Sequence, residues 1–117
     1  PNIVGKSDDA KVSIAKTDIG MIETLLDQYY LDMGHYPSSE EGLRVLYKEP
    51  ESEEEKWKGP YSKKPIPDDP WENPYHYVQP GEHSNQPYEI WSYGRDNQEG
   101  GEKFDEDIVS WVDVDED

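Results

Sequence analysis

The chain has 117 residues and no cysteine, so it has room for one domain with a modest core and cannot form disulfides or thiolate metal sites. Its formal net charge of -17 disfavours binding to nucleic acid or to an anionic membrane surface, and favours cations and basic partners. Because only 32% of the residues are hydrophobic, the four tryptophans and nine tyrosines must supply much of the core.

The N-terminus and the hydropathy of the chain bear on membrane attachment. Since the sequence begins with Pro1 rather than methionine, we expect a processed or excised fragment of a longer precursor. No run approaches the roughly 20 apolar residues that span a bilayer. We therefore expect this fragment to be soluble, with any membrane anchor removed or never present.

Residues 6–33 carry the periodicity of one long helix. Apolar residues recur in alternating steps of three and four, which places them on one helix face. They are Val12, Ala15, Ile19, Ile22, Leu26, Tyr29 and Met33, and a second row at Ile14, Met21, Leu25 and Tyr30 is expected to widen the buried face. Gly34 is expected to end the helix. A helix of about 42 Å is long for so small a domain, so part of it is expected to project beyond the head.

A second, shorter helix is predicted after Tyr36-Pro37. Ser38 and Glu41 have the spacing of a capping box, and the apolar residues of 43–47 follow, with an end near Pro50. Residues 51–74 are rich in proline and charge, which is typical of an extended loop. Three aromatic residues are expected to attach this loop to the core, and they are Trp57, Tyr61 and Trp71.

The remaining apolar segments, 75–78, 88–93 and 108–112, have strand-like composition, with a turn at Pro80-Gly81. Three antiparallel strands packed on the long helix give an α+β fold. We expect a single domain over 1–117, with a helical spine at 6–33, a head at 34–112 and a solvated acidic tail at 113–117.

The loop 93–107 is the one concentration of possible chemistry. From Asp96 to Asp107, six of twelve residues are acidic, and Gly100-Gly101 lets the chain fold back. Crowded carboxylates repel one another unless a cation relieves them, and Ca²⁺ accepts irregular oxygen shells more readily than Mg²⁺. The alternative is a solvated turn. An EF-hand is excluded because Gln98 and Gly100 occupy ligand positions and the flanks are strand-like.

An ordered set of motifs over nearly the whole chain resembles one family, the major pseudopilins (G subunits) of the type II secretion system. The segments that carry the resemblance are Pro1-Asn2, Ala15-Lys16-Thr17-Asp18-Ile19, Leu26-Asp27-Gln28-Tyr29-Tyr30-Leu31-Asp32, Tyr36-Pro37, Glu41-Gly42-Leu43, Asp69-Pro70-Trp71-Glu72-Asn73-Pro74-Tyr75, Pro80-Gly81-Glu82-His83, Ser92-Tyr93-Gly94, Gly100-Gly101 and Asp107-Ile108.

The resemblance implies a pilin-like structural subunit rather than an enzyme. Such a subunit is made with a leader, cleaved by prepilin peptidase and anchored in the inner membrane by an N-terminal helix, with its head in the periplasm. It polymerises with itself into a pseudopilus that drives folded proteins across the outer membrane. The expected partners are further copies of the chain, minor pseudopilins and the inner-membrane assembly platform.

The resemblance also implies a structural calcium site in the acidic loop. The matching ligands are the side chains of Asp96 and Asp107 and the main-chain carbonyls of Tyr93 and Asp105. One position differs from the family's ligand set, because this sequence has Lys103 where the family has an aspartate. Lys103 could turn outward while Glu102 or the side chain of Asp105 fills in, water could complete the shell, or Lys103 could itself replace the ion as counter-charge.

A second candidate site lies on the long helix. Glu23 and Asp27 are four residues apart, where like charges are mildly destabilising unless a positive group opposes them. They are either a solvated face or an interface, and in the second case Lys63 and Lys64 of a neighbouring subunit are the expected partners.

The sequence is also compatible with other functions. The alternatives for function are a type IV pilin, a minor pseudopilin, or a freestanding extracellular calcium-binding module. The segment Asp69-Pro70-Trp71-Glu72-Asn73-Pro74-Tyr75 is interpreted as structural, because its prolines set a turn and its aromatic rings enter the core. The three histidines have no metal-ligand spacing, and no catalytic motif is present.

Overall fold

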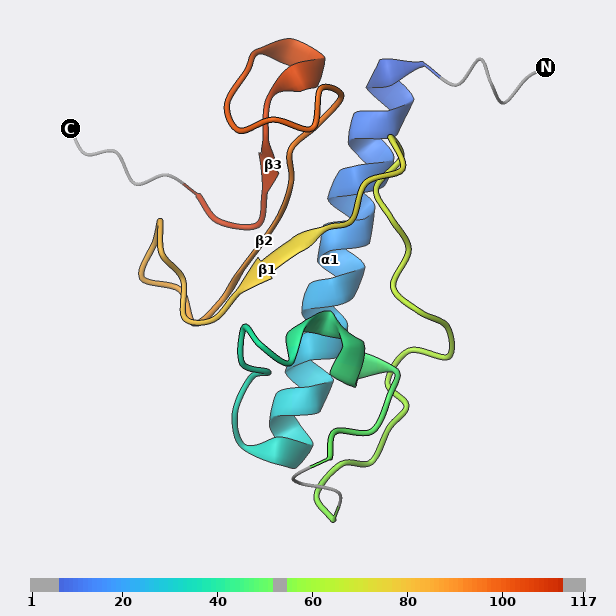
Figure 1. Cartoon of the computed structure of the whole chain (residues 1–117), viewed down its shortest axis with the longest axis vertical. Coiled ribbons are helices and arrows are strands. Elements are labelled where there is room, and N and C mark those ends of the chain that lie inside the picture. The colour runs from blue at the N-terminus through green and yellow to red at the C-terminus, as the bar shows by residue number, and fades with distance from the viewer. Residues whose placement is uncertain (1–6, 52–54, 113–117) are drawn as a thin grey trace.

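The fold is built from one long helix and a small antiparallel sheet that lies against it (Figure 1). The computed structural model describes residues 7–51 and 55–112. The elements in chain order are α1 (Asp8–Met33), the 3₁₀ helix η2 (Gly42–Leu46), β1 (His76–Val78), β2 (Glu89–Ser92), the 3₁₀ helix η3 (Lys103–Asp105) and β3 (Ile108–Val109). The predicted acidic tail, the helix start at residue 6 and part of the charged run after Pro50 lie outside the described residues.

Both ends of α1 are capped by the residues that flank it. The Ser7 hydroxyl accepts a hydrogen bond from the Ala10 N–H at 3.1 Å, which satisfies one free donor of the first turn. Gly34, with φ of 83°, ends the helix and donates its N–H to the Tyr30 carbonyl. The predicted helix and its terminator are therefore confirmed. No helix in the described ranges combines the length and apolarity that crossing a membrane requires.

The buried face of α1 is narrower than predicted. The main apolar row is buried from Ala15 to Met33, and Val12 and Leu25 pack against it. The prediction was wrong for Met21 and Tyr30, which are 41% and 43% exposed, because the head covers one side of the helix only.

The helix does not project beyond the head in the described residues. Asp8, in the first turn of α1, accepts hydrogen bonds from the Trp71 indole and from Arg95. At the other end, Asp32 accepts one from the Tyr61 hydroxyl at 2.6 Å. The expected projection is therefore absent here.

The predicted capping box is present, and the short helix predicted after it is present as a 3₁₀ helix. The Ser38 hydroxyl accepts from the Glu41 N–H, and the Glu41 carboxylate accepts from the Ser38 N–H, both at 3.1 Å. Gly42 then takes φ of 67°, a left-handed conformation that an α-helix cannot contain. A 3₁₀ helix follows and ends at Leu46, four residues before Pro50.

The sheet has the order β1-β2-β3 and is antiparallel throughout. Tyr77 pairs with Ile90, and Ser92 pairs with Ile108. The strands are shorter than predicted, most of all β3. There the Ser110 N–H still donates to the Ile90 carbonyl, but the Ser110 hydroxyl, rather than its carbonyl, accepts from Ile90 N–H, so the ladder ends at Val109.

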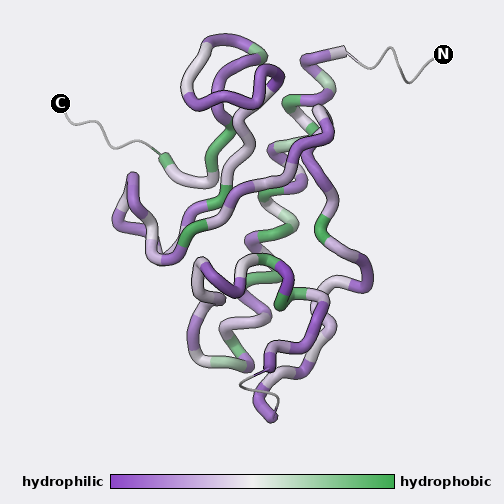
Figure 2. The backbone as a smooth tube through the Cα atoms, viewed as in Figure 1, coloured by the Kyte–Doolittle hydropathy of each residue, from purple (hydrophilic) through white to green (hydrophobic). Residues whose placement is uncertain are grey.

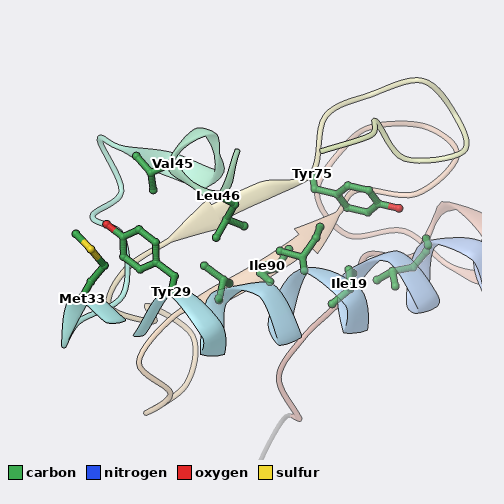
Figure 3. Packing of buried hydrophobic residues seen from close by; sticks show 11 residues of the cluster. Ile19, Tyr29, Met33, Val45, Leu46, Tyr75 and Ile90 are labelled. Atoms are coloured by element: carbon green, nitrogen blue, oxygen red, sulfur yellow. The ribbon is translucent and has the colours of Figure 1, made fainter. Parts of the chain in front are cut away.

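The core lies between α1, β2 and η2 (Figure 3). Ile22, Leu26 and Tyr29 are fully buried on the helix, and they meet Leu46 and Ile90, which are also fully buried. Figure 2 shows hydrophobic residues alternating with hydrophilic ones along α1, whereas the loop before β3 is almost wholly hydrophilic. The core therefore fixes α1 to the sheet and leaves the acidic loop at the surface.

The predicted aromatic attachments of the proline-rich loop are confirmed. Trp57, Tyr61 and Trp71 are partly buried against the core. The Trp57 indole donates to the Val45 carbonyl at 2.8 Å, and that of Trp71 to Asp8 at 3.3 Å. Figure 1 shows the loop passing along the side of α1 before it enters β1.

Candidate functional site

The acidic loop 93–107 connects β2 to β3 and lies beside the first turns of α1 (Figure 1). The Arg95 N–H donates to the Phe104 carbonyl at 2.8 Å, which brings the two arms of the loop together. The backbone folds back at Gly100 and Gly101, with φ of 88° and 95°. The loop is therefore closed by its own main chain, as a short ion-binding loop requires.

Two of the predicted ligands border this glycine pair. Both oxygens of the Asp107 carboxylate accept from the Gly100 N–H, at 3.0 and 3.1 Å. A Cβ at Gly101 would lie only 2.5 Å from the Asp105 carbonyl oxygen, so the close approach of these two segments requires glycine. The Asp107 carboxylate thus contacts Gly100, and the Asp105 carbonyl lies against the adjacent Gly101.

The charge around Asp107 is strongly negative. Burial raises the pKa of the Asp107 carboxyl, the Gly100 N–H opposes that rise, and the charges of Glu99, Asp96 and Glu106 add to it. The side chain of Asp96, the other predicted carboxylate ligand, accepts from the Gln98 N–H at 3.1 Å. The donor chemistry suits a hard cation, because the groups available are carboxylate and carbonyl oxygens.

The remaining predicted ligands are Tyr93 and Glu102. Tyr93 is half-buried, with its ring 4.6 Å from that of His76, and Glu102 is exposed, with its carbonyl accepting from the Asp105 N–H. In the part of the chain that the structure describes, no three acidic or histidine side chains are grouped closely enough to hold a metal. Main-chain carbonyls would therefore have to complete the shell, as in the ligand set that the sequence predicted.

The counter-charge at Asp105 comes from Arg95, which is not among the ligands that the sequence predicts. Arg95 Nε lies 3.0 Å from Asp105 Oδ1, and a second nitrogen of Arg95 lies 3.2 Å from Asp8 Oδ2. Lys103 is exposed, has φ of 55° and forms no ion pair with any described residue. The one signal in the sequence is an arginine in a loop that holds six acidic residues.

The second candidate site is a pocket of about 220 Å³ on the side of α1. Glu23 and Asp27 line it together with Tyr36 and Tyr88. The Tyr36 hydroxyl donates to Asp27 at 3.2 Å, and burial together with the charge of Asp27 raises the pKa of Glu23. The structure therefore brings the two predicted carboxylates together at one pocket.

Their predicted partners lie elsewhere. Lys63 and Lys64 are exposed in the proline-rich loop, and within the described residues neither forms an ion pair with any acidic group. Inside a single chain the two pairs of charges thus remain separate, and both are accessible to a neighbouring molecule.

A long helix that packs on a small antiparallel sheet, with a short helix and an acidic loop in the head, defines a pilin-like subunit. The match is specific: residues 2–111 fit the family model described as Type II secretion system (T2SS), protein G. The chain belongs to this family, so it is a structural pseudopilus subunit, and the resemblance noted in the sequence is confirmed.

Individual relatives agree with this assignment. The chain is 43% identical to type II secretion system core protein G of Pseudomonas aeruginosa, over 95% of this chain and 78% of that protein. It is 38% identical to the protein of the same name from Vibrio cholerae, over 95% and 75% of the two. The fold superposes on the major pseudopilin of the type 2 secretion system of enterohaemorrhagic Escherichia coli with a TM-score of 0.71 and 34% identity, covering 95% of each chain.

Proposed function

We propose that copies of this chain polymerise into the periplasmic pseudopilus of a type II secretion system, whose growth drives folded proteins across the outer membrane. The observation that carries the proposal is the surface of α1 that the head leaves uncovered. Met21 and Leu31 are exposed there, Leu31 to 82%. Apolar residues on an uncovered helix face favour packing against another helix, which the neighbouring subunit supplies.

Family membership supports further parts of this proposal. In the cell the chain would be continuous with an N-terminal segment anchored in the inner membrane, with its head in the periplasm. Its partners would then be the minor pseudopilins and the inner-membrane assembly platform. The work proposed is mechanical assembly, without catalysis.

The proposed contact between subunits joins the pocket at Glu23 and Asp27 of one copy to Lys63 and Lys64 of the next. Two carboxylates and two tyrosines line a pocket of a size that admits one long basic side chain. The raised pKa of Glu23 reflects burial and the neighbouring charge of Asp27, and an ammonium group beside the two carboxylates would favour their charged forms. Complementary charge would then set the register of the filament.

Reversing the charges of the lysine pair tests this contact. Lys63→Glu with Lys64→Glu is expected to abolish pseudopilus assembly in cells that build the filament from this protein, because four carboxylates would then face one another. Thermal unfolding of the isolated head should stay unchanged, since both lysines are exposed.

Two matched variants sharpen the test. Lys56→Glu with Lys58→Glu makes the same change in net charge on the same loop and should leave assembly intact. Adding Glu23→Lys and Asp27→Lys to the lysine reversal should restore filaments. Normal assembly by the variant that carries Lys63→Glu and Lys64→Glu, or failure of the compensating variant, would contradict the proposed pairing.

We further propose that the acidic loop holds a structural Ca²⁺ ion. The side chains of Asp96 and Asp107 and the carbonyls of Tyr93 and Asp105 would hold it, with Glu102 as an additional ligand in place of the aspartate that Lys103 replaces. The support is the position of the Asp107 carboxylate at Gly100 and of the Asp105 carbonyl at the adjacent Gly101. Because Asp105 is bound to Arg95, its carboxylate is engaged elsewhere.

Calcium is expected to raise the melting temperature of the head by several degrees relative to the same protein in excess chelator. A ligand present at 100 times its dissociation constant adds about 2.7 kcal/mol to folding stability. Asp107→Asn should abolish the shift, and Glu106→Gln, which changes an exposed neighbour, should retain most of it. Lys103→Asp should increase the shift. An unchanged melting temperature, with no heat in a calcium titration, would show that the loop folds without the ion.

A further inference from the structure

A cleft of about 720 Å³ lies on the face of the sheet that the core does not use. Trp91 and Val109 face each other in the sheet register, and the neighbouring pair, Ser92 and Ile108, is buried. Because successive residues of a strand point to opposite faces, Trp91 and Val109 point away from α1. The cleft also takes in residues from the two loops at opposite ends of β2.

The lining combines two kinds of group. Three partly exposed aromatic rings form the wall, and they are Trp91, Tyr93 and Trp111. Four carboxylates also line the cleft, and they are Glu82, Glu99, Glu106 and Asp107. Among the described residues that line the cleft there is no lysine or arginine, and His83 is the one basic side chain. The charge at the rim is thus negative, while the wall is aromatic.

The rings hold one another in fixed orientations. Trp91 and Trp111 meet edge to face at 6.0 Å and 79°, and the His83 ring stacks on Trp111 at 5.0 Å and 7°. His83 is itself held by a hydrogen bond to the buried Glu89. These aromatic rings are therefore ordered before a ligand binds, which lowers the entropic cost of binding.

We propose that this cleft binds an arginine side chain presented by a basic segment of a partner protein. A cation is attracted to the face of a tryptophan or tyrosine ring, and the planar guanidinium also stacks on such rings. Carboxylates at the rim accept the N–H groups of the guanidinium in pairs, which a lysine ammonium cannot match. A cationic ligand is inferred from charge complementarity, because both the lining of the cleft and the whole chain are strongly acidic.

This site differs from the proposed calcium site in its chemistry. A hard cation needs a shell of oxygens, whereas two tryptophan rings and one tyrosine ring line this cleft. Asp107 and Tyr93 border both sites, but Glu82 and Glu106 belong to neither the predicted calcium ligands nor the filament contact. Binding of arginine is thus expected with Ca²⁺ in excess and also in the presence of a chelator.

The four indole N–H signals of the ¹⁵N-labelled protein provide the test, because two tryptophans line the cleft and two do not. Titration with the peptide acetyl-Gly-Arg-Gly-amide is expected to shift the signals of Trp91 and Trp111. Those of Trp57 and Trp71 should stay in place, since these indoles bind Val45 and Asp8 away from the cleft. The same peptide with citrulline in place of arginine keeps the shape without the charge and should leave all four signals unmoved.

Variants connect the shifts to the carboxylates. Glu82→Gln with Glu106→Gln is expected to weaken arginine binding about fivefold, in line with the modest strength of partly exposed cation contacts. Glu40→Gln with Glu49→Gln makes the same change in net charge at exposed positions outside the cleft and should bind as the parent does. The spectra themselves report whether each variant is folded.

Several results would overturn the proposal. Equal shifts with the citrulline peptide, or equal affinity of the two glutamine variants, would show that charge is not recognised. Shifts of Trp91 and Trp111 that follow protein concentration alone would identify a second copy of the chain as the occupant. Stronger shifts with a neutral N-acetylglucosamine oligosaccharide than with the arginine peptide would identify a glycan surface instead.

Discussion

Replacing Asp69 by alanine is expected to lower the free energy of unfolding by about 3 kcal/mol, and the melting temperature by roughly 10–20 °C. Asp69 is 3% exposed, and its carboxylate accepts hydrogen bonds from three donors. The Trp71 and Asn73 N–H groups donate to one oxygen at 3.0 and 2.9 Å, and the buried Ser92 hydroxyl donates to the other at 2.6 Å. Alanine would leave these donors unsatisfied in the interior.

The neighbouring aspartate provides the control for this prediction. Asp68 is exposed, and Asp68→Ala should change the unfolding free energy by less than about 0.5 kcal/mol. Chemical denaturation of both variants gives the comparison directly. Similar stabilities would mean that the turn from Asp69 to Asn73 is held by its prolines and rings alone, and that the carboxylate contributes little.

Replacing Glu89 by alanine is expected to cost about 2–3 kcal/mol and to loosen the turn between β1 and β2. Glu89 is fully buried and accepts from the His83 N–H at 2.8 Å, the His83 ring at 3.0 Å and the Ser84 hydroxyl at 2.8 Å. A Cβ at Gly81 would lie 2.8 Å from the same carboxylate, so the turn wraps closely around it. Hydrogen exchange at residues 80–88 should accelerate in the variant.

An exposed residue of the same turn serves as the control. Glu82→Ala should leave both the stability and the exchange rates of this turn close to those of the parent. If Glu89→Ala behaves in the same way, then the turn is ordered by its backbone and not by the buried carboxylate.

The ion pair between Glu89 and His83 is expected to make stability depend on pH. Burial opposes ionisation of Glu89, but hydrogen bonds from His83, Ser84 and the backbone outweigh it and lower the pKa of the carboxyl below 4.5. The hydrogen bond to Glu89 raises the pKa of His83 above 6.5. The contribution of Glu89 is present above pH 4.5 and is lost as the pH falls through its lowered pKa. That of His83 is present below pH 6.5 and is lost as the pH rises through its raised pKa.

The pair should therefore stabilise the head most between about pH 4.5 and 6.5. The difference in unfolding free energy between the parent and His83→Gln is expected to be larger at pH 5.5 than at pH 9. A difference that is constant over this range would show that the imidazolium charge makes no contribution.

The sequence pattern correctly predicted those elements that are set by residues close together in the chain. The apolar period of α1, its terminator Gly34 and the capping box at Ser38 each act over a few residues, and each is present. The short second helix is also present, but it is a 3₁₀ helix that begins at Gly42, whose left-handed backbone the cap does not determine. The exposure of Met21 and Tyr30 was missed because it depends on which side of α1 the sheet covers.

The acidic loop shows the same division. Its density of carboxylates and its glycine hinge were visible in the sequence, and the structure brings Asp107 and the Asp105 carbonyl to that hinge. The pairing of Arg95 with Asp8 joins residues 87 positions apart, and the bond from Ser92 to Asp69 joins residues 23 apart. No local pattern specifies such partners. The sequence around an arginine does not determine which of several carboxylates it will pair with, because the fold decides which of them lies within reach.

The sequence by itself determined the family, the long helix, the strand-rich head and the concentration of negative charge before β3. These features are properties of composition, period and ordered motifs. Only the tertiary structure decided which carboxylates are buried and bonded, such as Asp69 and Glu89, and which remain free at a surface. The physical reason is that the cost of burying a charge depends on donors supplied by distant segments, and folding alone brings those donors within hydrogen-bonding distance.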